Sequence, residues 1–165
     1  VLTAEGAISS AMMRSDVAIC ESSCLVIGYG RIGRSLTSML LGLGARVTAA
    51  ARRAPVREQI AIDGARAIDM SGMAGALSEM RFIFSTPPER VLDEEALSRI
   101  NPGALLMELA SAPYGFDMEQ ATRMGIRAVV EPGLPGRYCP RSAAAALLDA
   151  ALKAMNAARK EHKEA

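Results

Sequence analysis

Three glycines in a short turn constrain the fold of this 165-residue chain more than any other feature of its sequence. Gly28, Gly30 and Gly33 match the pattern G-x-G-x-x-G. They follow the apolar segment 24–27 directly and precede a segment, 32–43, in which apolar residues recur with helical spacing. A buried strand, a glycine turn and a helix in this order are typical of the phosphate-binding unit of a dinucleotide-binding α/β domain.

Each glycine of this turn has a separate physical task. Gly28 permits the tight turn, Gly30 lets the backbone approach a pyrophosphate without a Cβ in the way, and Gly33 lets the helix lie close to the sheet. Backbone N–H groups and the positive end of the helix then face the phosphates. The alternative is a tight strand–helix turn that binds nothing. The candidate cofactor-binding residues in this turn are Gly28, Tyr29, Gly30, Arg31, Ile32 and Gly33.

Strand-like and helix-like segments alternate along the whole chain. We expect strands at 24–27, 46–51, 67–68, 81–85, 104–109 and 126–130, with helices between them. Such alternation is typical of a parallel sheet with helices on both faces. The sequence therefore predicts one Rossmann-like, doubly wound α/β domain over residues 1–165. We expect its sheet to be six-stranded and mainly parallel, and residues 159–165 to form a charged tail.

The end of the second expected strand indicates which dinucleotide is bound. A carboxylate about 20 residues beyond the glycines would bind the ribose 2′-hydroxyl of NAD. The sequence has Ala51, Arg52 and Arg53 at this place. Arginine pairs with a 2′-phosphate through charge-assisted hydrogen bonds. The sequence thus favours NADP, with NAD possible, although two solvated arginines would be compatible with either cofactor.

Further candidates follow the fourth and fifth expected strands, at the sheet edge where open α/β sheets bind ligands. Thr86 and Pro87 come directly after the strand at 81–85. Thr86 could contact the nicotinamide ribose, and a plain strand end is an equal alternative. Ser111 follows the strand at 104–109 and would face the same cleft.

The Gly/Pro-rich segment 132–140 predicts a rigid loop before a long Ala-rich helix. Arg137, Tyr138 and Arg141 supply hydrogen-bond donors that suit a dicarboxylate substrate, and Ser142 would cap the helix and place its N-terminus toward an anion. The alternative is a stiff connector with an N-cap. The side chains expected to face inward from the helix are those of Leu147, Leu148, Ala151, Leu152 and Met155.

No proton acceptor is evident, so the catalytic residue is left unassigned. Glu108 and Glu131 each follow a strand and could serve, but a capping or hydrogen-bonded role is favoured for both. His162 lies in the charged tail, where a solvated side chain is expected. Cys139 has no His near it in sequence and is interpreted as a small packed residue.

Charge and cysteine content exclude several classes of protein. Nineteen basic and eighteen acidic residues leave a net charge of +1, which argues against nucleic acid as a partner. No apolar run approaches the roughly 20 residues that cross a bilayer. Three cysteines without a C-x-x-C pair argue against disulfides and a zinc site. We expect a cytoplasmic protein that needs no metal and no membrane and forms a homo-oligomer.

Taken together, these motifs resemble the family of the A subunit of dipicolinate synthase, a bacterial sporulation enzyme. The matching stretches are 3–7, 28–33, 108–115 and 132–143. Basic residues at positions 137 and 141 fit the family pattern, whereas Cys139 departs from the small residue that is usual there. More distantly, the layout looks like the nucleotide-binding lobe of D-2-hydroxyacid dehydrogenases and adenosylhomocysteinase.

The resemblance implies an NAD(P)-dependent oxidation of a hydroxy-tetrahydrodipicolinate to dipicolinate, with a flavoprotein like the B subunit of dipicolinate synthase as partner. The resemblance also implies an additional N-terminal α/β domain, which we expect to be missing from this chain, so that the isolated chain could bind nucleotide without turnover. Two alternatives stay open. One is a non-catalytic dinucleotide-sensing module. The other is the lobe of a D-2-hydroxyacid dehydrogenase-like enzyme, against which the absence of an Arg in 110–113 argues.

Overall fold

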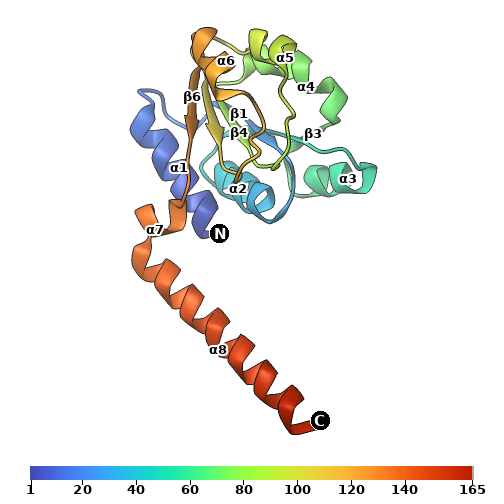
Figure 1. Ribbon diagram of the computed structural model, residues 1–165. Helices are drawn as coiled ribbons and strands as arrows, with labels where there is room; N and C mark the ends of the chain where they lie inside the picture. Colours follow the sequence, from blue (N-terminus) through green and yellow to red (C-terminus); the bar gives the residue numbers. More distant parts are fainter. Residues whose placement is uncertain (165) are drawn as a thin grey trace.

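Six parallel strands in the order β3-β2-β1-β4-β5-β6 form the centre of the computed structural model (Figure 1). The structure describes residues 1–164, and for residues 158 and 160–164 it describes the backbone alone. The strands are β1 (Ser23–Ile27), β2 (Arg46–Ala50), β3 (Arg66–Ile68), β4 (Phe82–Ser85), β5 (Leu105–Glu108) and β6 (Arg127–Val130). The strand order reverses between β1 and β4, so a ligand is expected at the carboxyl ends of these two strands.

Helices cover both faces of the sheet, because alternate side chains of a strand point to opposite sides. Val26 and Phe84 belong to one apolar cluster, whereas Leu25 and Ile83 belong to the other. The first cluster is covered by α1 (Leu2–Arg14), α2 (Arg31–Gly42), α3 (Ala54–Ile62) and α7 (Leu134–Tyr138). The second is covered by α4 (Met73–Ala76), α5 (Glu94–Ser98) and α6 (Met118–Arg123), with the 3-10 turns η1 (Met70–Gly72) and η2 (Leu77–Glu79) beside α4. The predicted doubly wound α/β fold is confirmed, and every strand pair is parallel.

The N-terminal helix α1 packs against α2 and α7. The buried face of α1 consists mostly of small residues, which lets the helices approach closely. A Cβ on Gly6 would lie only 3.0 Å from the Cβ of Leu134 in α7. This packing brings the start of the chain to the segment that follows β6.

Two expectations for the segment after β6 are wrong. Residues 132–140 are not a continuous loop, because 134–138 form the helix α7. The long helix α8 (Pro140–Glu164) begins before Ser142, so Ser142 lies within its first turn and does not cap it. Pro140 explains the earlier start, since the fixed φ of proline suits the first position of a helix and its missing N–H is not needed there.

The apolar face of α8 is also not directed inward as expected. Leu147, Leu148, Leu152 and Met155 are 72%, 63%, 50% and 60% exposed, and Ala151 is exposed as well. The helix extends away from the sheet and its covering helices (Figure 1). Helical periodicity shows that a helix has an apolar face, but it does not show what that face contacts.

The tail expected over 159–165 continues α8 as far as Glu164, and residue 165 lies outside the described residues. In the part of the chain that the structure describes, no helix is both long and apolar enough to cross a bilayer.

Candidate dinucleotide-binding site

The glycine turn joins β1 to α2 at the point where the strand order reverses. Gly28 has a φ of +86°, and a Cβ on it would come within 2.6 Å of Thr86 Oγ1. A Cβ on Gly33 would collide with the carbonyl oxygen of Gly28. By contrast, no atom lies within 4 Å of a Cβ built on Gly30. Gly28 and Gly33 therefore shape the turn, whereas Gly30 leaves open space in front of the helix N-terminus.

Tyr29 anchors the turn to the C-terminal end of α3. Its hydroxyl donates to Asp63 Oδ2 at 2.7 Å, and the same carboxylate accepts from Gln59 at 2.8 Å and pairs with Arg34 at 3.2 Å. Burial, together with the bond to Asp63, raises the pKa of Tyr29 well above its usual value. The hydroxyl thus stays protonated and engaged, and the ring of Tyr29 serves as a wall of the site.

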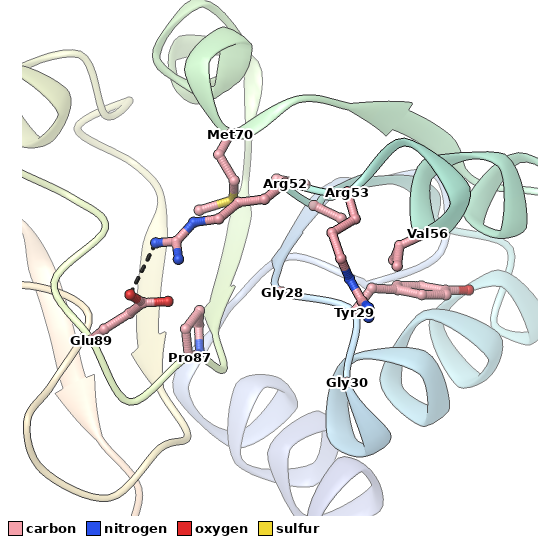
Figure 2. Close-up of a pocket in the computed structure, with 11 residues that line it drawn as sticks. Gly28, Tyr29, Gly30, Arg52, Arg53, Val56, Met70, Pro87 and Glu89 are labelled. Carbon is pink, nitrogen blue, oxygen red and sulfur yellow. Dashed lines mark ion pairs between the residues drawn. The ribbon is translucent and has the colours of Figure 1, made fainter.

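A cleft of about 390 Å³ opens between the glycine turn, the end of β2 and the loop after β4 (Figure 2). Three apolar side chains, from Val56, Met70 and Pro87, come from different segments and line it. Apolar walls with a few polar groups suit a planar base joined to a sugar. The full lining is Gly28, Tyr29, Gly30, Ala50, Ala51, Arg52, Arg53, Val56, Met70, Pro87 and Glu89.

Both candidate arginines line this cleft, but in different ways. Arg52 Nη2 lies 3.0 Å from Glu89 Oε2, whereas Arg53 points toward the glycine turn (Figure 2). Arg57 fixes the segment that carries them. It donates to the carbonyl oxygens of Ala51 and Arg52 and pairs with Asp69 at 2.6 Å.

Several residues at or beside the cleft were not predicted from the sequence, among them Glu89, Met70, Val56 and Arg57. Arg57 follows Arg53 by one helical turn, which was a usable signal for a residue near the same segment. Glu89 and Met70 carried no motif, since only the fold brings them to the cleft.

The residues after β4 and β5 have unequal access to the cleft. Pro87 lines it, but the Thr86 hydroxyl donates to the carbonyl oxygen of Ile27 at 2.8 Å and so ties β4 to β1. Ser111 is exposed in the loop after β5 and is not part of the cleft lining. At the start of α2, Arg31 is exposed and Ile32 packs against the core.

Glu108 shapes the loop that carries Ser111. Its buried carboxylate accepts from the N–H of Ala110 at 2.8 Å and from the N–H of Gly115 at 2.7 Å. Burial raises its pKa, and the backbone hydrogen bonds offset only part of that rise. This is the hydrogen-bonded role that the sequence favoured.

The substrate-side candidates lie away from the cleft lining. Arg137 pairs with the buried carboxylate of Glu131, which also accepts from Ser10 Oγ at 2.6 Å and Arg14 Nε at 2.9 Å. The guanidinium of Arg137 lies 5.4 Å from the ring centre of Tyr138. Glu131 thus joins α1 to α7. Arg141 and Ser142 are exposed in the first turn of α8.

Replacing Arg137 should therefore affect stability. We expect Arg137→Ala to lower the free energy of unfolding by about 1–2 kcal/mol, because Glu131 loses one charge-assisted hydrogen bond. This value lies toward the lower end of what a hydrogen bond to a charged group contributes, since the Arg137 side chain is 46% exposed and solvent screens the pair. Urea denaturation measures the change.

Arg141→Ala is the matched control, because Arg141 is an exposed arginine for which no ion pair is found among the described residues. It should stay within about 0.5 kcal/mol of the parent chain. Equal stability of the two variants would show that the pair with Glu131 contributes nothing.

This chain is similar to a known family of domains and to several known proteins. Residues 3–114 match the family model for the NAD-binding domain of D-isomer specific 2-hydroxyacid dehydrogenases. The chain belongs to this family. Membership gives a nicotinamide dinucleotide as the cofactor class of this domain. No group of three or more His, Cys, Asp and Glu side chains within the described residues could hold a metal ion.

The resemblance to the A subunit of dipicolinate synthase is confirmed. The curated A subunit of Bacillus subtilis (strain 168) is 32% identical over 141 residues, which is 86% of this chain and 48% of that protein. A crystal structure of the Bacillus subtilis protein superposes with a TM-score of 0.93 at 30% identity, covering 97% of this chain and 54% of that one. The corresponding protein from Bacillus halodurans gives 0.90 at 33% identity, covering 93% and 53%.

The chain spans about half the length of the relatives it matches. A transhydrogenase from Sinorhizobium meliloti, 22% identical with a TM-score of 0.71 over 82% of this chain and 47% of that one, shares the fold alone.

Proposed function

We propose that this chain is the nucleotide-binding part of an oxidoreductase like the A subunit of dipicolinate synthase, and that it binds NADP in the cleft beside the glycine turn. The observation that carries the proposal is the open space in front of Gly30, next to a cleft with apolar walls at the switch point of the sheet. This combination leaves room for a pyrophosphate at the N-terminus of α2.

The residues present fit such a cofactor. Backbone N–H groups after Gly30 would hold the pyrophosphate, the side chains of Val56, Met70 and Pro87 would contact the adenine, and Arg53 would meet a 2′-phosphate. When bound, the nicotinamide accepts a hydride from the substrate. The chain's own part is to hold and orient the dinucleotide at the carboxyl edge of the sheet.

The proposed reaction is oxidation of a hydroxy-tetrahydrodipicolinate to dipicolinate in the cytoplasm, with a flavoprotein like the B subunit of dipicolinate synthase as partner. The homology to the dipicolinate synthase relatives supports this reaction. The substrate-side role of Arg137, Tyr138, Arg141 and Ser142 stays a proposal, as does a homo-oligomer.

A dinucleotide-binding module without chemistry is the second candidate, because none of the substrate-side residues lines the cleft. Both functions require cofactor binding, and only the first requires turnover of the substrate when the partner flavoprotein is added. Formation of NADPH, followed by its absorbance, separates the two.

The cofactor preference can be tested at Arg53. Arg53→Ala should weaken NADP binding about 10-fold, which corresponds to about 1.4 kcal/mol, and leave NAD binding within about 2-fold. The reason is that NAD has no 2′-phosphate for the guanidinium to meet. Isothermal titration calorimetry with both dinucleotides provides the measurement.

Arg66→Ala is the matched control, because Arg66 is exposed at the start of β3 and lies outside the cleft lining. It should leave both affinities unchanged. A parent chain that prefers NAD, or an Arg53→Ala chain with unaltered NADP affinity, would show that Arg53 is only a solvated residue.

A further inference from the structure

The cleft contains an acidic side chain opposite its arginines. Glu89 comes from the loop after β4, and Arg52 comes from the end of β2, so the two side chains approach from opposite walls. Figure 2 shows Arg52 reaching across the cleft between Met70 and Pro87, with its guanidinium directed at Glu89. The Nη2 to Oε2 distance is 3.0 Å.

This ion pair is easily opened. The side chain of Arg52 is 61% exposed and that of Glu89 is 51% exposed. Solvent screens such a pair, and holding two long side chains in one geometry costs conformational entropy. A phosphate monoester with more than one negative charge can therefore compete with the carboxylate for Arg52.

The other basic side chains around the cleft differ in how far they are engaged. Arg57 pairs with Asp69 and donates to backbone carbonyls, and Arg34 pairs with Asp63. No ion pair of Arg53 is found among the residues that the structure describes. Arg53 can therefore bind an anion without giving up an ion pair, whereas Arg52 must first release Glu89.

We propose that Glu89 is a specificity-determining residue, which limits the preference for NADP over NAD by competing with the 2′-phosphate for Arg52. This rests on the proposed binding of a nicotinamide dinucleotide in the same cleft. Glu89 acts in two ways, since its carboxylate occupies the guanidinium of Arg52 and its negative charge repels a 2′-phosphate placed beside that guanidinium. NAD carries no 2′-phosphate and is insensitive to both effects.

The test is the variant Glu89→Gln, which keeps the shape of the side chain and removes its charge. We expect NADP to bind about 3- to 10-fold more tightly, with NAD affinity within about 2-fold of the parent, as measured by calorimetry. Adenosine 2′,5′-bisphosphate and 5′-AMP should show the same contrast, because they differ only in the 2′-phosphate. Arg52→Ala combined with Glu89→Gln should lose most of the gain.

Glu119→Gln is the matched control for the change in net charge. Glu119 is an exposed carboxylate on α6 whose nearest described cation, Arg123, is 4.0 Å away. The Glu119→Gln chain should bind NADP and NAD with the affinities of the parent chain.

Three results would overturn the proposal. One is an unchanged NADP affinity in Glu89→Gln. Another is an equal gain for NADP and NAD, which would mean that Glu89 repels the pyrophosphate that both share. The third is a folded parent chain that binds neither dinucleotide, which would also overturn the proposed function. In the first two results the parent chain still binds NAD. A failure of this proposal can therefore be distinguished from a failure of the proposed function.

Discussion

Gly30→Val should abolish dinucleotide binding while leaving the fold in place. The backbone of Gly30 has φ −80° and ψ −162°, an extended conformation that valine adopts readily, and no atom lies within 4 Å of the new Cβ. The space that valine would fill is the space proposed for the pyrophosphate. We expect at least a 100-fold loss of NADP affinity, equivalent to about 2.7 kcal/mol, in a calorimetric titration.

This substitution should lower the stability of the fold only slightly. Gly30 is the N-cap of α2, and valine is a poorer cap than glycine, by about 1 kcal/mol. For a domain of this size that corresponds to a melting temperature lower by about 2–4 °C. A folded Gly30→Val chain with the parent's NADP affinity would contradict the proposed site.

Two further glycines make the experiment specific. Gly42→Val changes the last residue of the same helix, where no atom lies within 4 Å of the new Cβ, and should leave NADP binding unaltered. Gly28→Val should instead lose stability, because φ is +86° and Thr86 blocks the side chain. The three variants separate loss of ligand space from loss of the turn.

Glu131→Ala should cost about 2–4 kcal/mol of unfolding free energy at neutral pH. The substitution removes the acceptor of Ser10, Arg14 and Arg137 and leaves the buried Ser10 hydroxyl without that partner. The cost stays below that of a fully buried ion pair, because both arginines are partly exposed and regain water. Urea denaturation measures it, with Glu58→Ala on the exposed side of α3 as a control expected within about 0.5 kcal/mol.

The same carboxylate should make stability depend on pH. Burial raises the pKa of Glu131, but the hydrogen bonds from Ser10 and Arg137 and the charge of Arg14 outweigh this and hold it below its usual value. Its stabilisation is therefore present above the unfolded-state pKa, about 4.3, and is lost as the pH falls through the lower folded-state value. The stability difference between the parent and Glu131→Gln should shrink from pH 7 to pH 3.5. A difference independent of pH would show that Glu131 does not titrate as described.

The sheet and the glycine turn were predictable from the sequence because their signals are local. Apolar runs such as 24–27 and 82–84 mark buried strands, and the glycine spacing marks the turn between strand and helix. The positions of Arg52 and Pro87 at the cleft followed from the rule that ligands lie at the carboxyl edge of a parallel sheet.

The remaining features depend on contacts between distant segments, which periodicity does not reveal. The ion pair between Arg137 and the chain's own Glu131 carried no motif in the sequence, and the role of Arg137 toward a substrate carboxylate stays a prediction. Glu89 carries no motif, and only the adjacency of β1 to both β2 and β4 brings it to Arg52. The apolar face of α8 was recognised correctly as a pattern and placed wrongly, because the pattern does not identify its partner.

The carboxylate that joins α1 to α7 also bears on how the chain folds during synthesis. The Ser10 to Glu131 bond spans 121 positions of the sequence, so α1 leaves the ribosome long before its anchor exists. A 13-residue helix gains little stability without tertiary packing. We expect α1 to be among the last elements to become protected in a pulsed hydrogen-exchange experiment on the nascent or refolding chain, although it comes first in the sequence.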